Sequence, residues 1–226
     1  MASTREELFA AIDAADVDRV RELVRAEPSL AAARDDAGVS ALMRGRYGLD
    51  KAIVRAILDA GPELDVFEAA ALGDLDALVA LLDENPADVT GRSADGFTAL
   101  HLAAFFGRQD AVRLLLDRGA DADAAGSGWM TGTPLHSATA ADLSDVVILL
   151  LEAGANPDPR QSGGFSPLHA AAQNGNASVV DALLERGADP SATTDDGRTA
   201  LDLAEASGDP DTIARLEAET RIDGGP

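Results

Sequence analysis

The sequence predicts an all-α solenoid of about seven helix pairs joined by short finger turns. Its first sign is a repeated word: residues 95–121 read DGFTALHLAAFFGRQDAVRLLLDRGAD, and similar stretches start at Thr133, Ser166 and Thr199. The second sign is the period, because these starts are 33 residues apart. A two-helix unit of this size cannot bury its own apolar face, so its stability has to come from stacking on its neighbours.

Within one unit, the apolar spacing predicts two short antiparallel helices. Leu100 and Ala104 lie at helical spacing on the first, and Val112 and Leu115 on the second. Gly107 stands between them, where glycine can take the left-handed conformation that ends a helix without steric cost.

The repeated words resemble the ankyrin repeat. From Thr133 the chain reads TPLHSATAADLSDVVILLLEAGAN, and from Ser166 it reads SPLHAAAQNGNASVVDALLERGAD. The resemblance covers essentially the whole chain and implies a short ankyrin-repeat protein of bacterial type. It also implies a partner-binding inner face, made of the fingers and the ends of the first helices.

The units follow in order from the leucine position of each first helix, which is occupied by Leu8, Leu42, Val66, Leu100, Leu135, Leu168 and Leu201. Neighbours are 33 to 35 residues apart, except that Val66 follows Leu42 after only 24. The missing residues are those of a finger, so GPELD alone joins the second and third pairs. We expect one solenoid with an irregular joint rather than two domains.

The expected organisation is therefore a single domain over 1–226. Its parts are an N-terminal capping unit (1–35), a divergent unit (36–63), a unit whose preceding finger is deleted (64–94), three best-matching repeats (95–196), and a C-terminal capping unit with tail (197–226). Asp202 and Glu205 stand at positions that hold histidine and alanine in other units. Polar residues there indicate a last unit with no neighbour beyond it.

The second unit departs most from the repeat, because it reads SALMRGRYG where TPLHLAA is expected. Met43 replaces the histidine, Gly45 falls inside a helix, and Arg46 replaces a packed alanine. One interpretation is drift near the chain end. The other is a local site in which Arg44 and Arg46 offer positive charge.

Composition sets further limits. The formal net charge is −22, which disfavours nucleic acid and anionic membranes as partners and suits either solubility or the steering of a basic partner. Cysteine is absent, so cysteine-based redox or metal chemistry is excluded. We find no signal peptide and no apolar stretch long enough to span a membrane, and we expect a cytoplasmic monomer.

No residue set predicts catalysis, a cofactor or a metal. His101, His136 and His169 occupy one position in successive repeats, so their rings should lie about one repeat apart, or about 10 Å. That distance is too long for a shared metal ion. The family resemblance instead assigns them a structural role, as hydrogen-bonding residues of the TPLH turn that also reach the adjoining unit.

What remains is a surface for a partner protein. The family's inner face maps onto most of this chain's aromatic residues. The candidate partner-binding residues are Tyr47, Leu72, Phe97, Phe105, Phe106, Trp129, Met130, Phe165, Gln173, Asn174 and Arg198. The alternative for the phenylalanines is that they pack between units as additional core.

We therefore predict a non-catalytic protein-interaction module that binds an unknown partner protein on its concave face, with a basic partner surface as one option. A structural or self-associating solenoid is the first alternative. An accessory regulator with a small-ligand site in the divergent second unit is the second.

Overall fold

The computed structural model describes residues 3–127 and 131–223, with side chains described up to 219, and it confirms the predicted all-α solenoid. The first helices of the pairs are α1 (Thr4–Asp13), α3 (Ala41–Tyr47), α5 (Val66–Leu72), α7 (Ala99–Phe105), α9 (Pro134–Ala140), α11 (Pro167–Asn174) and α13 (Ala200–Ser207). The second helices are α2 (Val17–Ala26), α4 (Lys51–Leu58), α6 (Leu75–Glu84), α8 (Gln109–Asp117), α10 (Ser144–Glu152), α12 (Ala177–Glu185) and α14 (Pro210–Asp223). Short 3₁₀ helices occupy η1 (Pro28–Ala32), η2 (Pro86–Thr90) and η3 (Ser162–Gly164).

Each first helix begins at a residue whose side chain can cap the free N–H groups of the first turn. These N-cap residues are Ser3, Ser40, Asp65, Thr98, Thr133, Ser166 and Thr199. In α7, α9 and α11 the third helical residue is a histidine, which completes a reciprocal capping box. In α5 the same part is played by Glu68, which is only 5% exposed and accepts a hydrogen bond from the Asp65 N–H.

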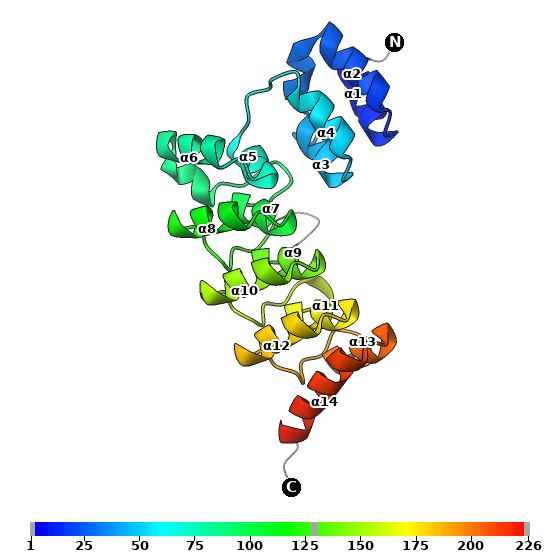
Figure 1. Cartoon of the computed structure of the whole chain (residues 1–226), viewed down its shortest axis with the longest axis vertical. Helices are drawn as coiled ribbons and strands as arrows, with labels where there is room; N and C mark the ends of the chain where they lie inside the picture. The colour runs from blue at the N-terminus through cyan, green and yellow to red at the C-terminus, as the bar shows by residue number, and fades with distance from the viewer. Residues whose placement is uncertain (1–2, 128–130, 224–226) are drawn as a thin grey trace.

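The pairs stack into an elongated array with α1 and α14 at opposite ends of its long axis (Figure 1). The largest core cluster runs from α5 to α14 and is made of leucine, valine and alanine side chains between neighbouring pairs. A second cluster lies within α1–α4 and the adjoining η1. Between them lies a small third cluster of described residues, made of Met43, Ala71, Phe97 and Leu102.

The joint between α4 and α5 lies where the finger is missing, and α1–α4 run at a different angle from the helices below them (Figure 1). The flanking fingers, residues 35–39 and 93–97, approach each other directly, so that a Cβ atom at Gly38 would lie 2.9 Å from the Ala94 Cβ. The deletion therefore brings the second unit into contact with the fourth, and it sets the surroundings of the site described next.

Candidate functional site

Three aromatic rings from two units meet at the C-terminal ends of α3 and α7, and we call Tyr47, Phe105 and Phe106 the aromatic cluster. The Tyr47 and Phe106 rings stack with centroids 6.1 Å apart, and Phe105 meets Phe106 edge to face at 5.1 Å. All three side chains are only partly buried. Tyr47 and Phe106 border the small third core cluster, so the aromatic cluster covers the joint and also presents apolar surface outward.

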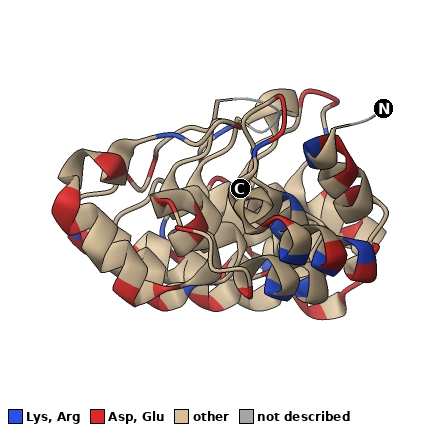
Figure 2. Ribbon diagram, turned by 90° about the horizontal axis from the view of Figure 1, so that it is seen from above, with Lys and Arg blue, Asp and Glu red and all other residues tan. Residues whose placement is uncertain are grey.

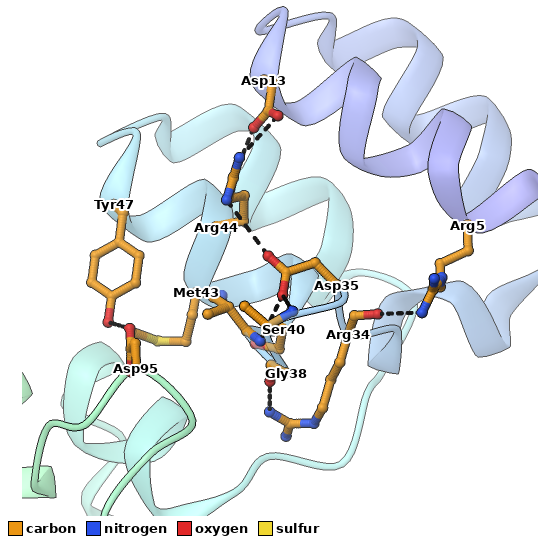
Figure 3. Close-up of polar contacts among 12 residues, drawn as sticks. Arg5, Asp13, Arg34, Asp35, Gly38, Ser40, Met43, Arg44, Tyr47 and Asp95 are labelled. Atoms are coloured by element: carbon orange, nitrogen blue, oxygen red, sulfur yellow. Dashed lines mark hydrogen bonds and ion pairs between the residues drawn. The ribbon is translucent and has the colours of Figure 1, made fainter. Parts of the chain in front are cut away.

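Tyr47 is fixed by the finger of the fourth unit, because its hydroxyl donates a 2.5 Å hydrogen bond to Asp95 Oδ2 (Figure 3). Burial and the Asp95 carboxylate both raise the pKa of Tyr47, so the phenol stays protonated at neutral pH. Asp95 also accepts a hydrogen bond from the Ser93 hydroxyl at 2.5 Å. The ring therefore holds one orientation across the joint.

Two guanidinium groups lie beside the aromatic cluster. Arg46 Nη2 and Arg108 Nε both donate to the carbonyl oxygen of Ala71, at 2.9 and 3.2 Å. The Arg46 Cζ lies 4.1 Å from the centroid of the Phe106 ring, which is a cation–π contact. Burial, with a contribution from the neighbouring Arg108 charge, lowers the pKa of Arg46 to about 10. Arg46 therefore remains charged at neutral pH, although water around it is partly replaced by protein.

Arg44 has a different environment from Arg46. Its guanidinium pairs with Asp13 of α1 at 2.8 Å and with Asp35 of the first finger at 3.5 Å (Figure 3). It therefore ties the second unit to the first. Its positive charge is already balanced by carboxylates of this chain.

A surface hollow of about 370 Å³ lies next to Tyr47, between the ends of α1 and α3. Ile12, Ala15, Gly48 and Ile53 contribute to its lining. Beyond it, the turn from α3 to α4 carries Leu49, whose side chain is 70% exposed. The lining also includes the charged residues Asp13, Arg44 and Asp50, so the surface next to Tyr47 is mixed in polarity.

The remaining candidate residues divide by burial. Phe97 is only 4% exposed and packs in the small third core cluster, which corrects its expected place on the binding face. Phe165 is half-buried against the His169 ring at 5.4 Å, and Leu72 packs against the α1–α4 core. Gln173, Asn174 and Arg198 are exposed, whereas Trp129 and Met130 lie outside the described residues.

Sequence reasoning missed Asp95, Arg108 and Leu49. Asp95 and Arg108 are 48 and 62 residues from their partners Tyr47 and Arg46, and only the stacking brings them together. The sequence did contain a signal for Leu49, because this leucine occupies a turn position that is glycine in several later units, such as Gly107.

The three histidines tie successive units together. The Nδ1 atoms of His101, His136 and His169 accept the backbone N–H of their own helix N-cap at 3.1 to 3.3 Å. This leaves the proton on Nε2, which donates to a carbonyl of the next unit, at Gly132, Phe165 and Arg198 respectively. Burial lowers the pKa of all three, to about 4 for His101. Both ring nitrogens are thus occupied by structural bonds.

Among the residues that the structure describes, no group of three or more His, Asp or Glu side chains could hold a metal ion. None of the helices that the structure describes is both long enough and apolar enough to cross a membrane.

Comparison with known families decides the identity of the fold. One family model, described as ankyrin repeats in three copies, matches residues 66–161, and a second, described as ankyrin repeats in many copies, matches residues 150–204. The chain belongs to the ankyrin-repeat family. Ankyrin repeats generally mediate protein–protein interactions, and ankyrin-repeat domains are typically non-catalytic.

Individual ankyrin-containing relatives match only a part of the chain. It is 50% identical over 62 residues to a probable E3 ubiquitin-protein ligase XBOS31, and 48% over 65 residues to the E3 ubiquitin-protein ligase XB3, both of Oryza sativa subsp. japonica. It is 38% identical over 61 residues to alpha-latrocrustotoxin-Lt1a of Latrodectus tredecimguttatus. These stretches cover 27%, 28% and 27% of this chain, but only 14%, 14% and 4% of the relatives. The likeness therefore concerns the repeats and not a ligase or toxin activity.

Proposed function

We propose that this ankyrin-repeat protein is a non-catalytic binding module. We further propose that a partner protein docks around the aromatic cluster, at the C-terminal ends of the first helices α3 and α7. The observation that carries the proposal is the cluster itself. Tyr47, Phe105 and Phe106 come from two units and remain partly exposed. Rigid aromatic side chains supply contact area at low entropic cost, and they are enriched among residues that dominate binding energy.

Other features support the same face. Leu49, two residues after Tyr47, exposes an apolar side chain, and Gln173 and Asn174 expose polar groups further along the stack. The net charge of −22 favours a partner protein that is basic outside its contact with the cluster, and it disfavours nucleic acid and anionic membranes. The absence of catalysis is supported by the histidines, because their ring nitrogens are held in hydrogen bonds.

The test is Phe105→Ala. The Phe105 ring touches Phe106 by its edge and belongs to none of the core clusters described above, so its loss should lower the free energy of unfolding by at most about 1 kcal/mol. A core phenylalanine would instead cost about 3–5 kcal/mol. We expect the folded variant to lose at least about tenfold in affinity for proteins captured from the source cell and identified by mass spectrometry.

The matched control is Ile148→Ala, which removes an exposed apolar side chain from α10, a second helix. Its capture should equal that of the unchanged protein. Equal capture by Phe105→Ala would place the binding face elsewhere. Light scattering over a concentration series separates a monomeric binder from the self-associating alternative, because only the latter gains mass as concentration rises.

A further inference from the structure

Arg46 and Arg108 form a pair of like charges that no carboxylate of this chain balances. Both guanidinium groups converge on the Ala71 carbonyl from different units, and neither makes an ion pair with any residue that the structure describes. Neighbouring Arg44, by contrast, pairs with Asp13 and Asp35. An unbalanced pair of cations is unexpected in a chain with 40 acidic and 18 basic side chains.

The pair also has more donors than its surroundings satisfy. A guanidinium group carries five N–H donors, and the Ala71 carbonyl takes one hydrogen bond from each arginine. Arg46 Nε is buried and has no hydrogen-bond partner. Leaving a buried donor unpaired costs free energy, so the setting of Arg46 is not one that folding alone favours.

The surroundings favour an acidic group at this place. The Arg46 charge lies over the Phe106 ring, in a setting of lower dielectric than bulk water, where attraction to a carboxylate is stronger than on an open surface. Residues 1–63 carry nine basic and 12 acidic side chains, against nine and 28 in residues 64–226. In the view along the long axis, Lys and Arg are most crowded on the side of the array where the N-terminus lies (Figure 2). Arg46 thus belongs to the less acidic part of the chain, where an acidic segment meets less repulsion than it would along the later units.

We propose that Arg46 and Arg108 together bind one carboxylate, the side chain of an Asp or Glu in a peptide segment of the partner protein, while an adjacent apolar side chain of that segment packs on Phe105. Two guanidinium groups can offer parallel N–H donors to the two oxygens of a carboxylate. This inference rests on the proposed function and specifies the chemistry that the aromatic cluster recognises. The partner can be basic elsewhere, because only one acidic anchor is required.

The probe is a phage library of random peptides selected on the 226-residue chain. We expect enriched peptides to share an Asp or Glu beside an apolar residue, and Phe105→Ala to weaken their binding. In a synthetic copy of such a peptide, Asp→Asn should weaken binding to the unchanged protein at least about tenfold. In the Arg108→Gln variant the same Asp→Asn change should weaken peptide binding at most about twofold, because the guanidinium group that pairs with the carboxylate is then absent.

Two further protein variants accompany this double-mutant cycle. Arg46→Lys keeps the positive charge but loses the planar set of guanidinium donors. It should weaken binding of the acidic peptide without abolishing it. Arg113→Gln is the matched control, since Arg113 is an exposed arginine of α8 that also makes no ion pair within the described ranges. Its affinity should be unchanged. Circular dichroism and urea denaturation of each variant show whether it is folded.

The outcomes separate the two proposals. Peptides that need Phe105 but show the same Asp→Asn effect on Arg108→Gln and on the unchanged protein would overturn the carboxylate site and leave the binding face standing. Enrichment of Lys or Arg peptides, or tighter binding when phosphoserine replaces the Asp, would also overturn it. Binding that is insensitive to Phe105→Ala would overturn the proposed face, and with it this inference.

Discussion

Leu49 holds a backbone conformation that leucine rarely takes. Its φ angle is 55°, in the left-handed region, and its side chain is 70% exposed. Gly73, Gly107 and Gly175 hold the corresponding turn in other units with φ between 66° and 76°. A residue with a Cβ atom in this region costs about 1–2 kcal/mol, and an exposed side chain recovers little of that through burial. A leucine here is easier to understand as a contact residue of the proposed face than as a folding residue.

The prediction at this scale is that Leu49→Gly makes the protein more stable. Relief of the strain should raise the free energy of unfolding by about 0.5–1 kcal/mol, after allowance for the greater freedom of glycine in the unfolded chain. Urea denaturation measures the change. Asp142→Gly is the control, because Asp142 has a φ of 57° but tolerates it better and accepts a hydrogen bond from Asn176. Asp142→Gly should raise the free energy of unfolding less than Leu49→Gly does. A Leu49→Gly variant that is less stable than the unchanged protein would contradict the strain argument.

At the scale of single elements, α3 owes its place to Gly45. Glycine inside a helix costs about 1 kcal/mol relative to alanine, and the sequence alone leaves drift and a local site as its two interpretations. A Cβ atom at Gly45 would lie 2.9 Å from Ile53 Cγ2 and 3.5 Å from Val54 Cγ2, both on α4. The glycine therefore permits the close approach of the two helices in the divergent unit, and this approach also holds Arg46 and Tyr47 in position.

We predict that Gly45→Ala lowers the free energy of unfolding by about 1–2 kcal/mol despite the better helix propensity of alanine, because the added methyl group overpacks the contact with Ile53. Thermal or urea denaturation measures it. In an Ile53→Ala background the opposing methyl group is absent, so Gly45→Ala should there be neutral or stabilising. The same loss in both backgrounds would refute the steric explanation.

At the scale of the whole molecule, stability depends on bonds that pass from unit to unit. His101, His136 and His169 each connect a helix N-cap with a carbonyl of the next unit. Burial lowers the pKa of each, so the folded protein holds them neutral. Arg92 and His136 add smaller repulsive contributions at His101. Protonation of these rings therefore opposes the stacking of the central repeats.

This predicts acid sensitivity. A group whose folded-state pKa is lowered binds fewer protons in the folded than in the unfolded protein, so its contribution is complete above about pH 6.5 and is lost as pH falls. For His101, with a folded pKa of about 4, the loss reaches on the order of 3 kcal/mol by pH 4. Burial raises the pKa of Glu68, so the folded protein binds the Glu68 proton more readily than the unfolded protein does. This contribution to stability grows as pH falls and offsets a part of the loss from the histidines.

Urea denaturation at a series of pH values between about 7 and 4 measures this dependence. His101→Gln is the informative variant, because glutamine can still complete the capping box but does not titrate. It should be less stable than the unchanged protein at neutral pH and show a shallower decline toward acid. A decline as steep as that of the unchanged protein would assign the acid sensitivity to other groups.

The sequence alone determined the all-α solenoid, because the repeated words fix both the helix faces and the capping residues that begin each unit. It also located the joint, from the short step between Leu42 and Val66. These features are local or periodic, so they can be recognised in the sequence without knowledge of tertiary contacts. The clustering of Tyr47 with Phe106 was anticipated only as a shared face and not as ring-on-ring contact.

The tertiary structure alone decided how the joint closes and what lies around it. Removal of one finger brings Asp95 to Tyr47 and places Arg108 beside Arg46. The sequence separation within each pair does not follow the repeat period, so the sequence does not indicate either contact. It also decided that Phe97 is core, because its ring packs with Met43, Ala71 and Leu102 at the joint while Phe105 stays partly exposed. A periodic pattern predicts what each unit repeats. The consequences of an interrupted period depend on how the flanking units pack, which only three-dimensional contacts determine.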